Sequence, residues 1–182
     1  MLSSSGASSS ATIENQFLSA RFDIASGLIQ VERKDGTTLL RNAAARTTLS
    51  GTTRSTSDSD YARTFSIRPC RNALGNGRQI SAICNDQRRQ LDFEVLLTLY
   101  DGRNALQIEV ICRNASAKDL NVLKIEPVRA VLEEGADCGW PDADKALTNG
   151  YLYADPGRVE DLGQSNRHAI TSMWNMGFHR GE

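Results

Sequence analysis

Residues 91–131, LDFEVLLTLYDGRNALQIEVICRNASAKDLNVLKIEPVRAV, decide the fold of this chain. In the first limb of this stretch, apolar residues recur at every second position. They are Leu91, Phe93, Val95, Leu97 and Leu99. Three of the positions between them carry polar side chains, which is the period of a β-strand with one buried face.

Two further limbs follow the first one. After turn residues at 101–104, apolar residues alternate with polar ones from Leu106 to Cys112, so the first two limbs are predicted to form a hairpin. The third limb, 120–128, is again β-branched and apolar. Pro127 indicates its end or an edge position, because proline cannot donate to a sheet ladder. We predict three neighbouring antiparallel strands in one sheet, whose apolar face the rest of the chain must cover.

The first 90 residues predict more strands of the same kind. Short apolar runs at 17–18, 22–24 and 28–31, separated by turn residues at 26–27 and 35–36, predict a meander of short strands. Segments 61–67 and 79–84 predict strands around a hairpin tip at 75–77. Segment 43–49 fits either a brief helix or a strand. Segment 51–60 is predicted to be a polar surface loop, in which Asp58 and Asp60 are either solvated or ligands of a cation. The predicted fold class is all-β, an antiparallel β-sandwich.

Net charge and the length of apolar runs limit the partners that this chain is expected to bind. The chain has 182 residues and a net charge of −1, with no basic block, so nucleic acid is an unsuitable partner. No apolar run approaches the roughly 20 residues that cross a bilayer, and the N-terminus lacks the pattern of a signal peptide. We expect a soluble protein, cytoplasmic or secreted after processing, with no membrane partner.

Four cysteines and two histidines are the candidate metal ligands and nucleophiles of the chain. Cys70, Cys84, Cys112 and Cys138 permit three full disulfide pairings, or they are buried thiols. No CxxC or HxxxH spacing occurs, so no metal or other cofactor is expected. Asn114 begins a formal N-glycosylation acceptor, which matters only in a secreted eukaryotic protein.

The predicted domain boundary lies near residue 12. Residues 1–11 are rich in serine and are expected to be a disordered leader or a cloning remnant. Residues 12–182 are expected to form a single β-sandwich domain. A long segment after residue 131 lacks a clean period and indicates a functional or interface loop. A last strand is predicted at 169–178, after which the chain stops without a cap, as if it were the front part of a longer enzyme.

Short motifs follow one another in the order of the expected strands. They are Ile13-Glu14-Asn15, Gly27-Leu28-Ile29, Asp35-Gly36-Thr37, Arg113-Asn114-Ala115-Ser116, Ile125-Glu126-Pro127, Leu147-Thr148-Asn149-Gly150-Tyr151 and Thr171-Ser172-Met173-Trp174. In this order the chain resembles the N-terminal domain of α-galactosidase and raffinose-synthase type glycoside hydrolases, from Thr12 onward. The resemblance implies a β-supersandwich related to the galactose-mutarotase fold.

The resemblance also implies where the chemistry lies. In that family the two catalytic aspartates stand on a separate (β/α)₈ barrel, one of them in a Lys-x-Asp setting, and no such setting or barrel pattern occurs here. Family members often follow an Asn-Gly-aromatic motif with Gln-Ser-Trp, but after Asn149-Gly150-Tyr151 this chain has LYAD at 152–155. The sugar contact made by that tryptophan in the family therefore does not carry over to this chain. The implied function is that of a non-catalytic accessory domain, which packs on a catalytic barrel of the parent chain, supports carbohydrate binding of galactosides and takes part in homo-oligomers.

Aromatic and acidic residues of the C-terminal segment are the predicted contacts to carbohydrate or to the partner domain. They are Trp140, Asp142, Tyr151, Tyr153 and Trp174. Aromatic planes stack on sugars and also anchor interfaces, and both roles stay open here. Two alternatives to the accessory role are a free-standing carbohydrate-binding module and a mutarotase-like sugar epimerase that uses His168 or His179.

Overall fold

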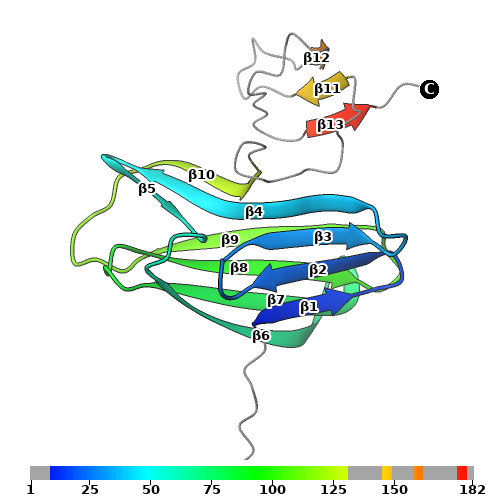
Figure 1. The fold of residues 1–182 in the computed structure, drawn as a ribbon, viewed down its shortest axis with the longest axis horizontal. Helices are drawn as coiled ribbons and strands as arrows, with labels where there is room; N and C mark the ends of the chain where they lie inside the picture. The colour runs from blue at the N-terminus through cyan, green and yellow to red at the C-terminus, as the bar shows by residue number, and fades with distance from the viewer. Residues whose placement is uncertain (1–8, 131–144, 149–157, 162–175, 180–182) are drawn as a thin grey trace, which may run out of the picture. The chain divides into compact units, whose positions relative to one another are not determined.

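The computed structural model describes residues 9–130, and the backbone of 145–148, 158–161 and 176–179. The chain divides into two compact units, residues 1–139 and 140–182. Each unit is built from antiparallel strands, and the first is a β-sandwich of two sheets (Figure 1), which confirms the predicted all-β class. The single domain from residue 12 to residue 182 stays a prediction.

A six-stranded antiparallel sheet forms one layer of the sandwich, in the order β1-β2-β3-β4-β10 with β5 also paired to β4. Its strands are β1 (Ser10–Glu14), β2 (Leu18–Asp23), β3 (Ile29–Arg33), β4 (Thr38–Leu49), β5 (Thr52–Ser55) and β10 (Val122–Arg129). The first three confirm the predicted meander. Because β1 starts at Ser10 and Ala11 is buried, ordered structure begins before the expected boundary at residue 12.

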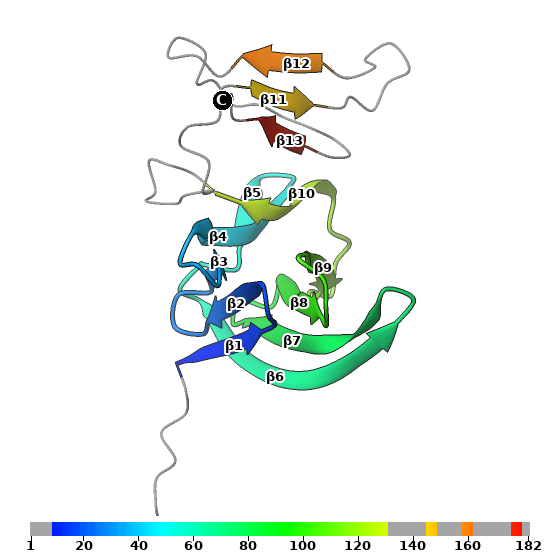
Figure 2. The ribbon, with the colours of Figure 1, turned by 90° about the vertical axis from the view of Figure 1, so that its right-hand side faces the viewer.

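A four-stranded antiparallel sheet in the order β6-β7-β8-β9 forms the other layer (Figure 2). Its strands are β6 (Tyr61–Asn72), β7 (Gly75–Asp86), β8 (Leu91–Tyr100) and β9 (Leu106–Asn114). Both predicted hairpins of this sheet are confirmed. The tip of the β6–β7 hairpin lies at 73–74, because Gly75 already pairs with Asn72.

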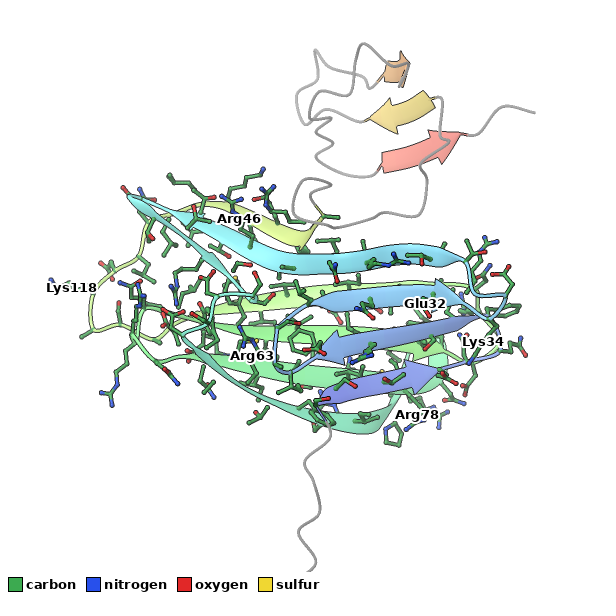
Figure 3. All side chains as sticks on the ribbon, viewed as in Figure 1. Glu32, Lys34, Arg46, Arg63, Arg78 and Lys118 are labelled. Carbon is green, nitrogen blue, oxygen red and sulfur yellow. The ribbon has the colours of Figure 1, made fainter. Side chains whose placement is uncertain are left out.

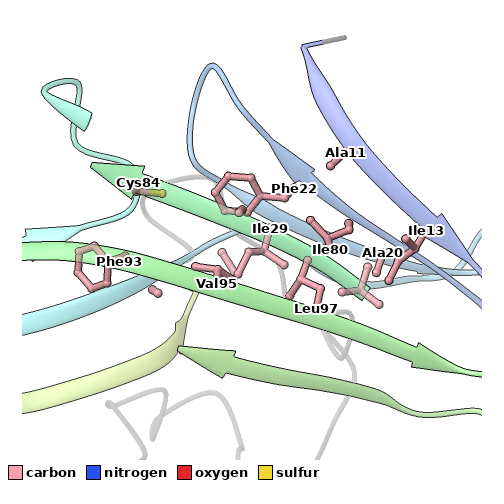
Figure 4. Close-up of a cluster of buried hydrophobic side chains, with 14 of the residues drawn as sticks. Ala11, Ile13, Ala20, Phe22, Ile29, Ile80, Cys84, Phe93, Val95 and Leu97 are labelled. Carbon is pink, nitrogen blue, oxygen red and sulfur yellow. The ribbon is translucent and has the colours of Figure 1, made fainter. Parts of the chain in front are cut away.

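The core lies between the inner faces of the two sheets. The alternating row of β8 predicted from sequence is almost fully buried, with Phe93, Val95 and Leu97 at 0% exposure. Phe22 and Ile80 come from opposite sheets and belong to the same buried cluster (Figure 4). Each large apolar side chain buried in this way contributes about 1.5–3 kcal/mol. Period-two burial therefore accounts for the stability of the sandwich.

Side chains tie the two sheets together at both ends. At one end, the Asn15 amide donates to the carbonyls of Tyr100 and Arg103 at 2.9 and 2.8 Å, so the β1–β2 turn is bound to the β8–β9 turn. At the other end, the Arg63 guanidinium on β6 donates to the carbonyls of Thr56 and Ala25, at 2.8 and 3.2 Å (Figure 3). These bonds fix how the sheets are stacked.

Strand β10 corrects the prediction of three neighbouring strands in one sheet. It pairs with β4 in the other sheet and not with β9, so the chain crosses between the layers after Asn114. Pro127 lies within this edge strand, near a register shift between Glu126 and Arg129, as the edge prediction requires. Segment 43–49, for which helix and strand were both open, belongs to strand β4.

The second unit contains a three-stranded antiparallel sheet. Its order is β12-β11-β13, with strands β11 (Lys145–Thr148), β12 (Arg158–Asp161) and β13 (Met176–His179). The strand predicted at 169–178 overlaps β13 only at its end, and the remainder of that segment lies outside the described residues.

Candidate functional site

The predicted contact residues lie outside the described residues. They are Trp140, Asp142, Tyr151, Tyr153 and Trp174. Their roles as sugar-stacking or interface residues stay predictions. The functional features that the structure does describe all belong to the sandwich.

A buried arginine organises the carboxylates at one end of the sandwich. The side chain of Arg54 on β5 is only 6% exposed, and its guanidinium lies 2.9 Å from Asp60, 3.0 Å from Asp86 and 3.4 Å from Asp58. It also stacks over the Tyr61 ring, 4.9 Å from the centroid. The prediction of a polar surface loop at 51–60 is therefore wrong around Arg54, which is buried on strand β5. Asp58 and Asp60 are neither free in solvent nor grouped as cation ligands, because they face a guanidinium.

Hydrogen bonds and ion pairs lower the pKa of several carboxyl groups in the sandwich. The hydrogen bond from Arg54 lowers the pKa of Asp60, and the bond from Arg113 lowers the pKa of Glu94. Within residues 9–130, every carboxyl group whose pKa departs from its ordinary value has that pKa lowered. These groups are Glu14, Asp23, Asp35, Asp60 and Glu94. A glycosidase general acid needs the opposite shift, so these groups suit structure and not acid catalysis.

Thiol chemistry and metal binding have little support in the described part of the chain. Cys70, Cys84 and Cys112 are free thiols, and the predicted burial is confirmed for Cys84. Burial raises the pKa of Cys84 to about 11 and also raises the pKa of half-buried Cys112, so neither forms a thiolate nucleophile at neutral pH. Among the described residues, no group of three or more acidic, histidine or cysteine side chains could hold a metal ion.

The sandwich core is left partly uncovered along β9. Val110 and Ile108 face the core and lie directly opposite Val95 and Leu97 of β8. The two β8 residues are fully buried, whereas their β9 partners are only half-buried, as are the other inward-facing residues of that strand, Leu106 and Cys112. β9 is the last strand in the order of its sheet. The inner row of this edge strand is therefore incompletely covered by the described residues.

Strand β10, which contacts β9, adds an exposed apolar surface. It carries four of the eight large hydrophobic residues that are exposed in the described part of the sandwich. These four are Val122, Leu123, Ile125 and Val128, with exposed fractions of 42%, 63%, 46% and 40%. β10 is also an edge strand of its sheet. Apolar side chains concentrated on a sheet edge are typical of an interface, since such an edge exposed to water promotes aggregation.

We define the β9–β10 edge as the inner row of β9 together with the exposed apolar residues of β10. The sequence indicated both strands but did not reveal this edge. The signal that could have revealed it is the run 122–128, VLKIEPV, in which apolar residues are too frequent for a strand with one solvated face.

Comparison with protein-family models, with curated proteins and with solved structures finds no match to this chain. Within its described residues, no helix has the length and apolar character needed to cross a bilayer.

Proposed function

We propose that this chain is the non-catalytic N-terminal accessory domain of an α-galactosidase-like glycoside hydrolase. In this role the sandwich packs on the (β/α)₈ catalytic barrel of the same parent protein. It supports carbohydrate binding at the rim of the sugar pocket and takes part in homo-oligomers. The family assignment comes from the sequence resemblance, and the packing role comes from the β9–β10 edge.

The uncovered edge is the observation that carries the packing role. Within the four-stranded sheet, the inner row of the edge strand β9 is less buried than that of its neighbour β8, so β9 keeps apolar surface that a partner could cover. Covering the exposed apolar residues of β10 at the same time would stabilise the complex by about 25 cal/mol for each Å² of apolar surface removed from water. A partner domain seated on the β9–β10 edge meets both needs.

The acids of the sandwich agree with a non-catalytic role. Retaining hydrolysis requires one ionised and one protonated carboxyl group about 5–5.5 Å apart. Asp60 and Glu94 are instead bound to arginine side chains, which favours the ionised form of each. The mutarotase-like alternative needs a general base and a general acid, often a histidine with a carboxylate, and the two histidines of the chain, His168 and His179, are not among residues 9–130. The accessory role places the chemistry on the barrel.

The proposal is tested on the protein encoded when the reading frame continues past Glu182, compared with the chain alone. We expect several hundred further residues with repeated strand–helix units, and hydrolysis of an α-galactoside by the longer protein only. Turnover by the chain alone, or a stop codon directly after Glu182, would contradict the accessory role. Calorimetry of the chain alone against raffinose tests the carbohydrate-binding-module alternative.

A matched pair of variants tests the β9–β10 edge itself. Leu123→Lys places a charge on β10, whereas Leu74→Lys places the same charge on an exposed leucine at the β6–β7 hairpin tip. In the longer protein, Leu123→Lys should lower the melting temperature of the packed domains and Leu74→Lys should not. In the chain alone, neither variant should unfold the sandwich. Equal effects of the two variants in the longer protein would argue against packing through this edge.

A further inference from the structure

A pocket opens at the end of the sandwich where three connections meet. It is lined by the β4–β5 turn, by the residue that precedes β8 and by the connection from β9 to β10. The lining residues are Leu49, Ser50, Thr52, Gln90, Ser116, Lys118, Asp119, Leu120 and Asn121. Its volume is about 380 Å³, within the range of small-molecule sites. Figure 3 shows Lys118 at this end of the sandwich, far from Lys34 at the other end.

The wall formed by the β9–β10 connection is fixed by its own hydrogen bonds. The Asn114 side chain donates to the carbonyl of Lys118 at 2.8 Å and accepts from the backbone N–H of Ser116 at 2.9 Å. The Ser116 hydroxyl donates to the same Lys118 carbonyl at 2.7 Å. These bonds stabilise the turn from Asn114 to Lys118 without any ligand.

Backbone bonds attach this wall to the other two. The Ala115 N–H donates to the carbonyl of Gln90 at 3.0 Å, and the Ser50 N–H donates to the carbonyl of Asn121 at 3.0 Å. All three connections are thus held in register around the pocket. A site that is organised in advance loses less conformational entropy when it binds.

Five exposed polar side chains at the pocket have no hydrogen bond or ion pair within the described part of the chain. These residues are Thr52, Gln90, Lys118, Asp119 and Asn121. Leu49 is buried and Leu120 is half-buried, and they supply apolar surface between the polar groups. The pocket therefore combines a small apolar patch with several unused donors and acceptors.

We propose that this pocket binds a neutral polyhydroxylated ligand, a monosaccharide or the end of a saccharide chain. The two amides and the threonine hydroxyl both donate and accept, as does each hydroxyl of a sugar. Lys118 contributes a donor and Asp119 an acceptor, and because their charges cancel, the pocket favours a neutral ligand over an anion. The apolar patch matches the C–H face of a pyranose ring.

The choice of a saccharide rests on the proposed function, whereas the pocket and its free polar groups do not. This pocket lies away from the C-terminal aromatic residues that the sequence indicated. It would give the accessory domain a sugar contact made by its own connections.

The test is an amide-detected NMR titration of the whole chain with galactose, with raffinose and with inorganic phosphate. Each probe is added to about 50 mM, which detects millimolar dissociation constants. We expect galactose or raffinose to shift the amides of the β9–β10 connection and the β4–β5 turn, and phosphate to leave them unchanged. Loss of a hydrogen bond to Asp119 in Asp119→Ala should weaken binding about tenfold. Asp101→Ala, an exposed aspartate in the β8–β9 turn at the opposite end of β9, should leave the affinity unchanged.

Several outcomes would overturn the proposal. They are no shift at these amides with either sugar, stronger shifts with phosphate, or equal weakening by Asp119→Ala and Asp101→Ala. The amide spectrum of each variant shows directly whether it is folded. If no sugar binds but Leu123→Lys still lowers the stability of the longer protein, only the sugar pocket is contradicted. If a sugar binds but Leu123→Lys has no such effect, only the packing role is contradicted.

Discussion

Replacing Arg54 with methionine is predicted to be among the most damaging single changes at the end of the sandwich. The Arg54 guanidinium is buried and bound by Asp60 and Asp86. Methionine keeps much of the side-chain volume but removes the charge. Asp60 still pairs with Arg88, whereas Asp86 loses its ion pair. Asp86 is the more costly of the two, because its side chain is 0% exposed and cannot recover water.

The magnitude follows from what Asp86 retains. Removing one partner of a buried ion pair typically costs about 3–5 kcal/mol. The Asp86 carboxylate still accepts backbone N–H groups from Arg88, Gln90 and Leu91, at 2.8, 3.1 and 3.1 Å. These bonds satisfy most of its acceptor capacity. We therefore expect the lower end of the range, about 3 kcal/mol.

Urea unfolding followed by circular dichroism measures this loss. With a slope of about 2 kcal/mol per molar urea, a 3 kcal/mol loss lowers the midpoint by about 1.5 M. Arg88→Met is the matched control, because Arg88 pairs with Asp60 at 2.5 Å but its side chain is 68% exposed. An exposed pair of this kind contributes less than about 1 kcal/mol.

The comparison of the two variants decides the question. If Arg54→Met costs less than about 1 kcal/mol, or no more than Arg88→Met, then burial of the guanidinium does not stabilise this end of the sandwich.

Three further predictions test the fold and its titrating groups. Gly27→Ala should lower the urea midpoint far more than Gly36→Ala. Both glycines have positive φ, but of the two only Gly27 would bring the added Cβ against a backbone atom, the Thr56 carbonyl oxygen at 1.9 Å. Equal losses of stability in the two variants would contradict this contact. The Arg54 guanidinium lowers the pKa of Asp60 in the folded state, so this ion pair stabilises the fold above the unfolded pKa near 3.9 and the stabilisation is lost as pH falls through the folded pKa. Asp60→Asn should therefore make the urea midpoint less dependent on pH below about 4. An unchanged pH dependence would refute this. Cys84 should react with iodoacetamide only after unfolding, as peptide mass spectrometry can show, and rapid labelling of the folded chain would contradict its burial.

Alternation in the sequence predicted the hairpin of β8 and β9 because it reports a local property. Side chains two residues apart share a face of a strand, so the row from Leu91 to Leu99 had to be buried together. The tight turn after Tyr100 then brings β9 back beside β8, with which it pairs. Both conditions are satisfied within about 25 residues, and both can be recognised without the rest of the chain.

The partner of β10 could not be predicted in the same way. Alternation shows which face of a strand is buried but not which strand lies beside it. The connection from Asn114 to Val122 is long enough to reach either sheet, and the pairing with β4 depends on an edge formed by residues more than 70 positions earlier. Strand β5 was missed for another reason: its threonines and Arg54 resemble a polar loop until the acidic partners of Arg54 are brought close.

The β9–β10 edge and the pocket could not be located from the sequence. The sequence indicated an interface and a sugar contact, and assigned both to the aromatic residues after Gly139, such as Trp140 and Tyr151. The exposed strand β10 and the pocket beside Asp119 carry no aromatic side chain. Both depend on residues from several distant segments, and their exposure is visible only once those segments have folded together.

The crossing of β10 to β4 has a consequence for synthesis on the ribosome. Leu49 pairs with Val122, and Ala44 pairs with Arg129, so one side of β4 waits unpaired until some 80 more residues have been translated. Pairings of such long sequence separation raise the contact order and slow folding. During that interval the unpaired edge of β4 can pair with another nascent chain. A chaperone that shields this edge would raise the yield of native protein.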